Sequence, residues 1–227
     1  MDVTARDLLF GDRPAEAWPE GAGAHGEPWD TFIRARRMQG SGDTAGAVEA
    51  WRAIAAMPGL ESRHYAQAWH FLRQAGIAPP AAEAKRVLGV VVEVGMDPGE
   101  DLVAGYADGS ARYFNFSGAA VIWEHPDASL DGQVRGLVEA GEVLAGKIGP
   151  WRGPRPPPVQ RGEVRVNLLT PSGLHFGQGP FDALARDQLG GPVIHRAQQL
   201  MQALIAKSEQ RPRGAEGEGH SDDEMAR

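Results

Sequence analysis

The sequence contains no cysteine, no long apolar run and no surplus of positive charge. Without cysteine the chain has no disulfide, no thiolate nucleophile and no zinc–cysteine or iron–sulfur site. A membrane helix needs about 20 consecutive apolar residues, and no stretch reaches that length. The N-terminus also lacks the basic region and the apolar core of a secretory signal. We therefore expect a cytoplasmic protein without a membrane partner.

The balance of charge disfavours nucleic acid as a partner. The chain has 30 acidic and 23 basic residues, which gives a net charge of −7. Long-range electrostatics keep such a chain away from phosphate backbones and anionic surfaces. The nearest thing to a basic patch, Arg34, Arg36 and Arg37, falls in a predicted helix, where we interpret it as a solvated face. We expect no nucleic-acid partner.

Recognisable catalytic motifs are missing as well. Ser172 and His175 lie close in sequence, with Asp182 or Asp187 nearby. A nucleophilic serine normally occupies a strained elbow such as G-x-S-x-G, whereas Ser172 stands in an ordinary Pro-Ser-Gly turn. His175 alternates with two apolar residues, so we expect it to face solvent or a neighbouring loop. The sequence predicts no catalytic residue.

Motifs for bound ions and cofactors are equally scarce. His64 and His70 are six residues apart, which fits neither the i+3 nor the i+4 spacing of a helical metal pair. The segment Gly177-Gln178-Gly179-Pro180 lacks the further glycine and the helix start that hold a pyrophosphate, and we expect it to be a loop. The sequence therefore predicts no metal ligand, no cofactor-binding residue and no cofactor.

Both ends of the chain are predicted to be flexible. Residues 1–27 are rich in glycine, proline, alanine and acid, and residues 208–227 are charged and of low complexity. The N-terminal arm carries one apolar cluster, Leu8, Leu9 and Phe10, which we interpret as a short docking segment for a partner.

Residues 28–86 are predicted to form a helical module. Five pairs of positions are 34 residues apart: Thr31 and Tyr65, Ala35 and Trp69, Met38 and Leu72, Gly42 and Gly76, and Ala47 and Ala81. With the stretch Gly42-Asp43-x-x-x-Ala47-x-x-x-Trp51-x-x-Ile54, this period resembles the tetratricopeptide repeat. The resemblance covers residues 29–82, about one and a half repeats. It implies a helical hairpin that docks on the neighbouring domain.

Residues 87–207 are predicted to form an α+β domain in the order ββββ-α-ββ-α, with two helices over one face of an antiparallel sheet. Strands are expected at 88–94, 102–106, 111–116, 119–123, 164–169 and 174–176. The Asp108-Gly109 pair predicts a hairpin turn. The proline-rich connection 149–162 is either a stiff spacer or a ligand for an aromatic groove. This domain resembles uncharacterised bacterial proteins, which implies no activity.

The leading hypothesis is a non-enzymatic adaptor, a protein–protein interaction protein of a bacterial cytoplasm. Tyrosine and tryptophan often anchor interfaces, so we predict that Tyr113, its neighbour Asn115, and Trp151 contact a partner, together with the apolar cluster of the N-terminal arm.

Two alternatives stay open. One is a small-molecule sensor or enzyme with a motif-less pocket between the sheet and the helical module, where His70, His175 and Glu93 would be the groups of interest. The other is a self-associating module in which a sheet edge or the last helix pairs across a two-fold axis. We expect the first to show convergent polar groups and the second to form dimers.

Overall fold

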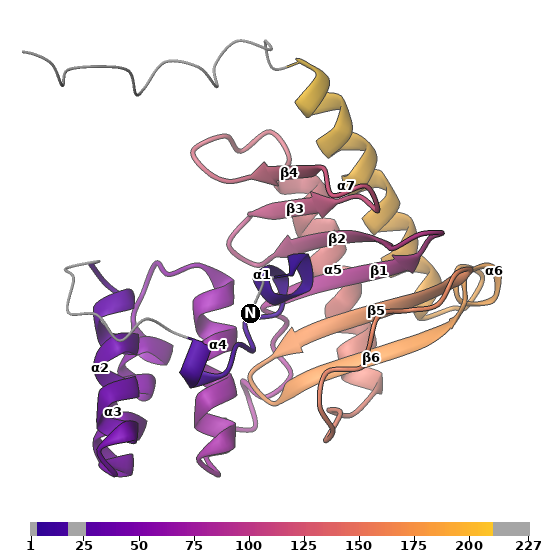
Figure 1. Cartoon of the computed structure of the whole chain (residues 1–227). Helices are drawn as coiled ribbons and strands as arrows, with labels where there is room; N and C mark the ends of the chain where they lie inside the picture. The colour runs from indigo at the N-terminus through magenta and orange to yellow at the C-terminus, as the bar shows by residue number, and fades with distance from the viewer. Residues whose placement is uncertain (1–3, 18–25, 211–227) are drawn as a thin grey trace, which may run out of the picture.

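The structure, a computed structural model, describes residues 4–17 and 26–210. It consists of a helical unit and a six-stranded antiparallel sheet with helices on both sides (Figure 1). Among the described residues, no helix is both long and apolar enough to cross a bilayer. The predicted tail 208–227 lies outside the described residues except for its first three positions, which end the last helix.

The helical unit contains α2 (Trp29–Gly40), α3 (Thr44–Ala56) and α4 (Ser62–Gln74). Asp43 caps α3, because its side chain accepts a hydrogen bond from the backbone of Gly46 at 2.9 Å. The three helices share an aromatic-rich core in which the rings of Trp51 and Phe71 stack at 5.2 Å. The helices lie where the apolar periodicity predicts them.

The sheet has the strand order β4-β3-β2-β1-β5-β6, and all neighbours are antiparallel. The strands are β1 (Gly89–Gly95), β2 (Glu100–Tyr106), β3 (Ala111–Phe114), β4 (Ala120–Trp123), β5 (Glu163–Thr170) and β6 (Gly173–Pro180). The predicted α+β class is confirmed. The spatial order shows that β5 returns to pair with β1, so the first strand lies inside the sheet.

Two long helices cover one face of the sheet, which we call the back face (Figure 1). They are α5 (Asp131–Lys147) and α7 (Gly190–Gln210), and the short α6 (Phe181–Leu184), which was not predicted, precedes α7. Val92, Val166 and Leu200 belong to the largest core, which fills the space between sheet and helices. Alternate residues of each strand point the other way, toward the front face.

The N-terminal residues lie on that front face rather than extending freely. The helix α1 (Ala5–Leu9) begins with a capping box between Thr4 and Asp7. Leu9 and Phe10 are 0% and 3% exposed and pack on the sheet against Val91 and its neighbours. The expectation of a flexible arm is therefore wrong for residues 4–17, because the apolar cluster finds a partner surface within its own chain. Residues 18–25 lie outside the described residues.

Gly11 allows the chain to leave this position. Its φ of +60° is a left-handed conformation, and a Cβ atom there would come within 2.8 Å of the Arg63 carbonyl oxygen of α4. Arg13 continues the contact, since its backbone exchanges two hydrogen bonds with the Gln67 side chain. The N-terminal segment thus lies between the sheet and the helical unit and contacts both.

Candidate functional site: the front face of the sheet

The front face divides into two halves. The covered half comprises the polar residues of β1, β2 and β5 that lie beneath α1 and the proline-rich connection, which are Glu93, Glu100, Arg165 and Asn167, together with Gln178 of β6, which is exposed at its margin. The open half comprises the residues of β3 and β4 that point the same way: the buried Arg112, and Phe114, Ala120 and Ile122. Strand register assigns both sets to one face, because residues paired across antiparallel strands share a side.

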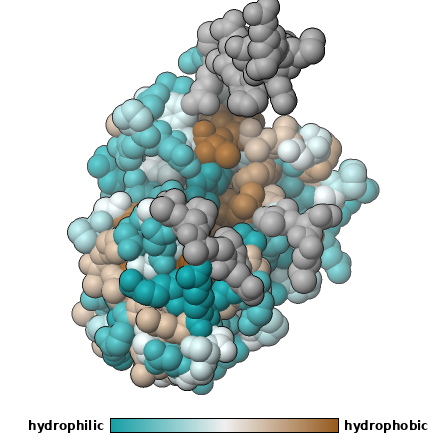
Figure 2. Space-filling model, turned by 60° about the vertical axis from the view of Figure 1, so that its left-hand side comes forward, coloured by the Kyte–Doolittle hydropathy of each residue, from teal (hydrophilic) through white to brown (hydrophobic). Residues whose placement is uncertain are grey.

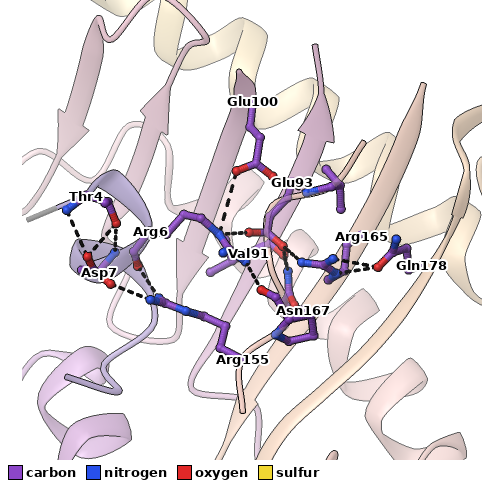
Figure 3. Close-up of polar contacts among 12 residues, drawn as sticks. Thr4, Arg6, Asp7, Val91, Glu93, Glu100, Arg155, Arg165, Asn167 and Gln178 are labelled. Carbon is purple, nitrogen blue, oxygen red and sulfur yellow. Dashed lines mark hydrogen bonds and ion pairs between the residues drawn. The ribbon is translucent and has the colours of Figure 1, made fainter. Parts of the chain in front are cut away.

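Glu93 is the centre of the covered half (Figure 3). Its carboxylate accepts a hydrogen bond from Arg6 Nε of α1 at 2.6 Å and another from Arg165 Nη1 of β5 at 2.8 Å. Asn167 Nδ2 donates a third at 3.1 Å. Glu93 is 0% exposed. Burying a carboxylate at such depth is costly unless it has oppositely charged partners and hydrogen bonds, and this one has both.

Arg165 is fixed by a second partner. Its Nε and Nη2 both donate to Gln178 Oε1 of β6, at 2.9 and 2.7 Å. Gln178 belongs to β6 because that strand continues to Pro180, so the expectation of a loop at 177–180 is wrong. Pairing with the length of β5 outweighs the low strand preference of glycine and proline there. The carboxylate of Glu93 is thereby oriented from β5 and β6 independently of α1.

The proline-rich connection crosses the front face as a strap. Pro156 accepts a hydrogen bond from Arg6 Nη2 at 2.8 Å through its backbone oxygen, and Val159 donates its N–H to Glu100 at 2.7 Å. Arg155 donates to the Arg6 carbonyl oxygen at 3.0 Å and to the Asp7 carboxylate at 2.5 Å. The segment thus contacts α1 and β2 and forms part of the site.

Electrostatics within the covered half follow from burial and these contacts. Burial raises the pKa of Glu100, an effect that the hydrogen bond from Val159 opposes. Burial alone would also raise the pKa of Asp7, but the hydrogen bonds from Thr4 and Arg155 outweigh it and lower the pKa to about 2. Asn167 Oδ1 is buried without a hydrogen-bond partner. The covered half is therefore rich in acceptors.

The open half differs from the covered half because its apolar side chains are at least partly exposed to solvent. Ile122 is 46% exposed, Ala120 is exposed and Phe114 is half-buried. Phe116, just beyond β3, is 48% exposed. Figure 2, which turns the side of the helical unit toward the viewer, shows apolar surface above that unit. Within the part of the chain that the structure describes, no helix lies over this part of the front face (Figure 1).

The two edges of the sheet also differ. At the β6 edge the strap makes a backbone contact, because the N–H of Trp151 donates to the Leu174 carbonyl oxygen at 2.6 Å. The β4 edge carries the sequence Ala-Val-Ile-Trp, and among the described strands only β3 pairs with it. Protective features of natural edges, such as lysine, proline or an inward charge, are missing from β4 itself. The open half thus adjoins an unprotected edge.

The residues predicted to bind a partner are scattered. Leu9 and Phe10 are buried on the chain's own sheet, whereas Leu8 is 43% exposed. Tyr113 faces the back, where its hydroxyl donates to Asp101 at 3.2 Å. Asn115 organises the β3–β4 turn, since its side-chain oxygen accepts from Ser117 and Ala119.

Trp151 is 49% exposed and meets the edge of the Phe176 ring at 5.5 Å. The structure therefore brings the predicted residues to three separate places.

The serine–histidine pair does form, but as part of a turn. Ser172 Oγ lies 3.0 Å from His175 Nε2 and 2.9 Å from Thr170 Oγ1. His175 is fully buried, contrary to the expected exposure, because β6 presents it to the back face, and burial lowers its pKa. Asp187 is engaged elsewhere, where it accepts the N–H groups of Leu189 and Gly190.

His175 and Glu93 lie on opposite faces of the sheet, so they cannot line one pocket. Within residues 4–17 and 26–210, no group of three or more acidic or histidine side chains is arranged to hold a metal ion.

Comparison with known protein families, with curated proteins and with solved structures finds no match to this chain. The resemblance of residues 29–82 to the tetratricopeptide repeat therefore stays a prediction.

Sequence reasoning named Glu93 but missed its partners Arg6, Arg165 and Gln178. A signal was present: Glu93, Arg165 and Asn167 interrupt otherwise apolar strands, where a buried charge requires an opposite one. Cross-strand register, which pairs Glu93 with Arg165 directly, supplies the rest. Arg6 carries no such local signal.

Proposed function

We propose that the protein is an adaptor that binds an extended segment of a partner protein along β4, next to the open half of the front face. The observation that carries this proposal is the unprotected β4 edge. An edge strand presents unpaired N–H and C=O groups that a further strand can complete.

The surroundings of β4 suit such a segment on both faces. A strand added beside β4 would place alternate side chains next to Ile122 and Ala120 on the front. Its other side chains would meet the end of α7, which crosses behind β4 and lays Lys207 Nζ 5.4 Å from the Trp123 ring centroid. We therefore expect a partner segment of alternating pattern, with apolar residues facing the front.

Charged residues lie beside Ile122 and Ala120 and affect which partner sequence would bind there. Arg112 is 7% exposed at its side chain and donates to the half-exposed Glu124 at 2.6 Å. Glu61, at the start of α4, lies 4.0 Å from Arg112. The exposed acids on this side favour a partner segment with basic residues beyond its apolar part.

A photo-crosslinking experiment tests the proposal. Benzoylphenylalanine replaces Ile122 or, as a matched control, Val143, an apolar residue of α5 that is 62% exposed on the other side of the molecule. The proposal is supported if position 122 alone crosslinks to one defined segment of another protein in the native cells. The Ile122→Lys variant should then lose that partner, and Val143→Lys should keep it.

Three results would overturn the proposal. These are no product at position 122, the same products at positions 122 and 143, and crosslinking at position 122 of two copies of this chain only. The last result would instead support the self-associating module, and light scattering should then show a dimer that Ile122→Lys dissociates.

A further inference from the structure

The covered half of the front face holds a guanidinium in a slot whose walls come entirely from the sheet domain. Arg6 Nε donates to Glu93, its Nη2 donates to the Pro156 carbonyl oxygen, and Glu100 lies 3.9 Å away as a second carboxylate. A planar fork with fixed donors matches this arrangement, whereas the ammonium group of lysine is a point charge. The slot therefore suits a guanidinium better than an ammonium group.

The slot is organised without the segment that fills it. Arg165 and Asn167 fix the Glu93 carboxylate from β5, and Gln178 fixes Arg165. The domain also has its own large core between sheet and back helices, to which α1 contributes nothing. A site whose binding group is held by surrounding residues is preorganised for its ligand.

More than one side chain of the N-terminal segment is recognised. Next to the slot, Arg155 binds the Asp7 carboxylate, and its guanidinium lies 4.8 Å from the Phe10 ring centroid. Leu9 enters an apolar socket and its carbonyl oxygen accepts from Tyr106 Oη at 2.8 Å. The segment Arg-Asp-Leu-Leu-Phe at 6–10 is thus bound through arginine, acid and two apolar residues, while Leu8 points away and is 43% exposed.

The bound segment is small and its attachment is limited. The helix α1 has five residues, and isolated helices of that length are not stable in water. Its binding rests on the slot, the socket and the contacts of Arg155, together with contacts to α4, where Arg63 Nη1 donates to the Leu8 carbonyl oxygen at 3.0 Å. Such a segment can be exchanged for another that offers the same groups.

We propose that the covered half is a peptide-binding site for an arginine-bearing segment of the pattern Arg-Asp-x-Leu-Phe, which this chain's own residues 6–10 occupy in competition with a partner's segment. This site is separate from β4, so it stands or falls independently of the function proposed above. Because the internal segment is tethered, it competes at an effective concentration in the millimolar range. A partner segment therefore gains access when the internal arginine is lost or displaced.

The test uses the full chain and a fluorescent peptide with the sequence of residues 4–12. We expect this peptide to bind the Arg6→Ala chain at least about tenfold more tightly than the unaltered chain, because the internal competitor is weakened. A matched peptide in which alanine replaces the arginine should not bind either chain. Adding Glu93→Gln to the Arg6→Ala chain should remove binding of the arginine peptide.

A small-molecule arm guards against poor folding of the Arg6→Ala chain. Ethylguanidinium should raise the melting temperature of that chain saturably, and ethylammonium at the same ionic strength should not. The proposal is overturned if both peptides bind equally, if the Arg6→Ala chain is folded and binds neither, or if it is unfolded and ethylguanidinium fails to restore folding.

Discussion

The two halves of one sheet face treat their side chains in opposite ways. In the covered half, Glu93 and Arg165 are charged and buried, whereas in the open half Ile122 is apolar and 46% exposed. Ordinary burial would reverse these assignments. The difference shows that the face is organised around its coverings, since α1 and the strap supply partners for Glu93 and Glu100. In the open half only Arg112 is buried, beside Glu124, and the apolar side chains stay at least partly exposed.

Removing the central carboxylate tests the covered half most severely. Glu93→Gln removes the carboxylate that pairs with both Arg6 and Arg165 and leaves Arg6 only the more distant Glu100, at 3.9 Å. We therefore expect a loss of about 3–5 kcal/mol in the free energy of unfolding. Glu124→Gln, which alters a half-exposed partner of Arg112, should cost only about 0–1 kcal/mol. Urea denaturation compares the two variants, and equal losses would remove the distinction between the halves.

Neighbouring leucines of α1 separate docking from exposure. Leu9→Ala opens a cavity between α1 and the sheet, for which we expect a destabilisation of about 2–4 kcal/mol. Leu8→Ala, one residue earlier and 43% exposed, should change stability by no more than about 0.5 kcal/mol. If thermal unfolding shows the two variants to be alike, then α1 does not rest on the sheet as described.

Acid should weaken the contact between the covered half and the helical unit. Burial, with the charges of Arg73 and Arg155, lowers the pKa of His70 on α4 from its ordinary value of 6.5 to about 4. The folded state therefore keeps His70 neutral while the unfolded chain takes up a proton. Stability is fully present above pH 6.5 and falls as the pH drops toward 4, by roughly 2 kcal/mol at pH 5.

His70→Gln should lose less stability than the parent chain between pH 7 and pH 5 in urea titrations, because glutamine takes up no proton. Identical pH dependence in both chains would contradict the assigned burial of His70.

The smallest effect is expected in the open half. Ile122→Lys should alter the free energy of unfolding by no more than about 0.5 kcal/mol, because the side chain is exposed at a sheet edge. A loss of more than 2 kcal/mol by chemical denaturation (about the cost of truncating a core residue) would mean that Ile122 is covered, and would weaken the proposal for β4.

Local patterns were sufficient for much of the fold. The apolar periodicity of α3 and α4, the apolar run of β1 and the alternation along β3 predict those elements close to their observed bounds. The pair Asp108-Gly109 predicts the β2–β3 hairpin, in which Gly109 has a φ of +87°. These signals depend on neighbouring residues, so a single sequence reveals them.

Other features depended on pairing at a distance. The glycines of β6 gave no strand signal, and only the register with β5 makes 177–180 part of the sheet and places Gln178 on Arg165. The apolar cluster at 8–10 predicts a docking segment for another molecule, whereas Leu9 and Phe10 pack on the sheet of the same chain. Composition describes what a segment can bury and does not say against which surface.

The sequence by itself determined the class of the fold, most of its elements and the scarcity of recognisable catalytic chemistry, because propensity and periodicity are local properties. Tertiary structure alone decided that Arg6 meets Glu93 across 87 positions of chain, and that the strap contacts the β6 edge while β4, among the described strands, pairs only with β3. A buried charge is stable only beside its partner, and that partner is fixed by how the chain returns to the sheet.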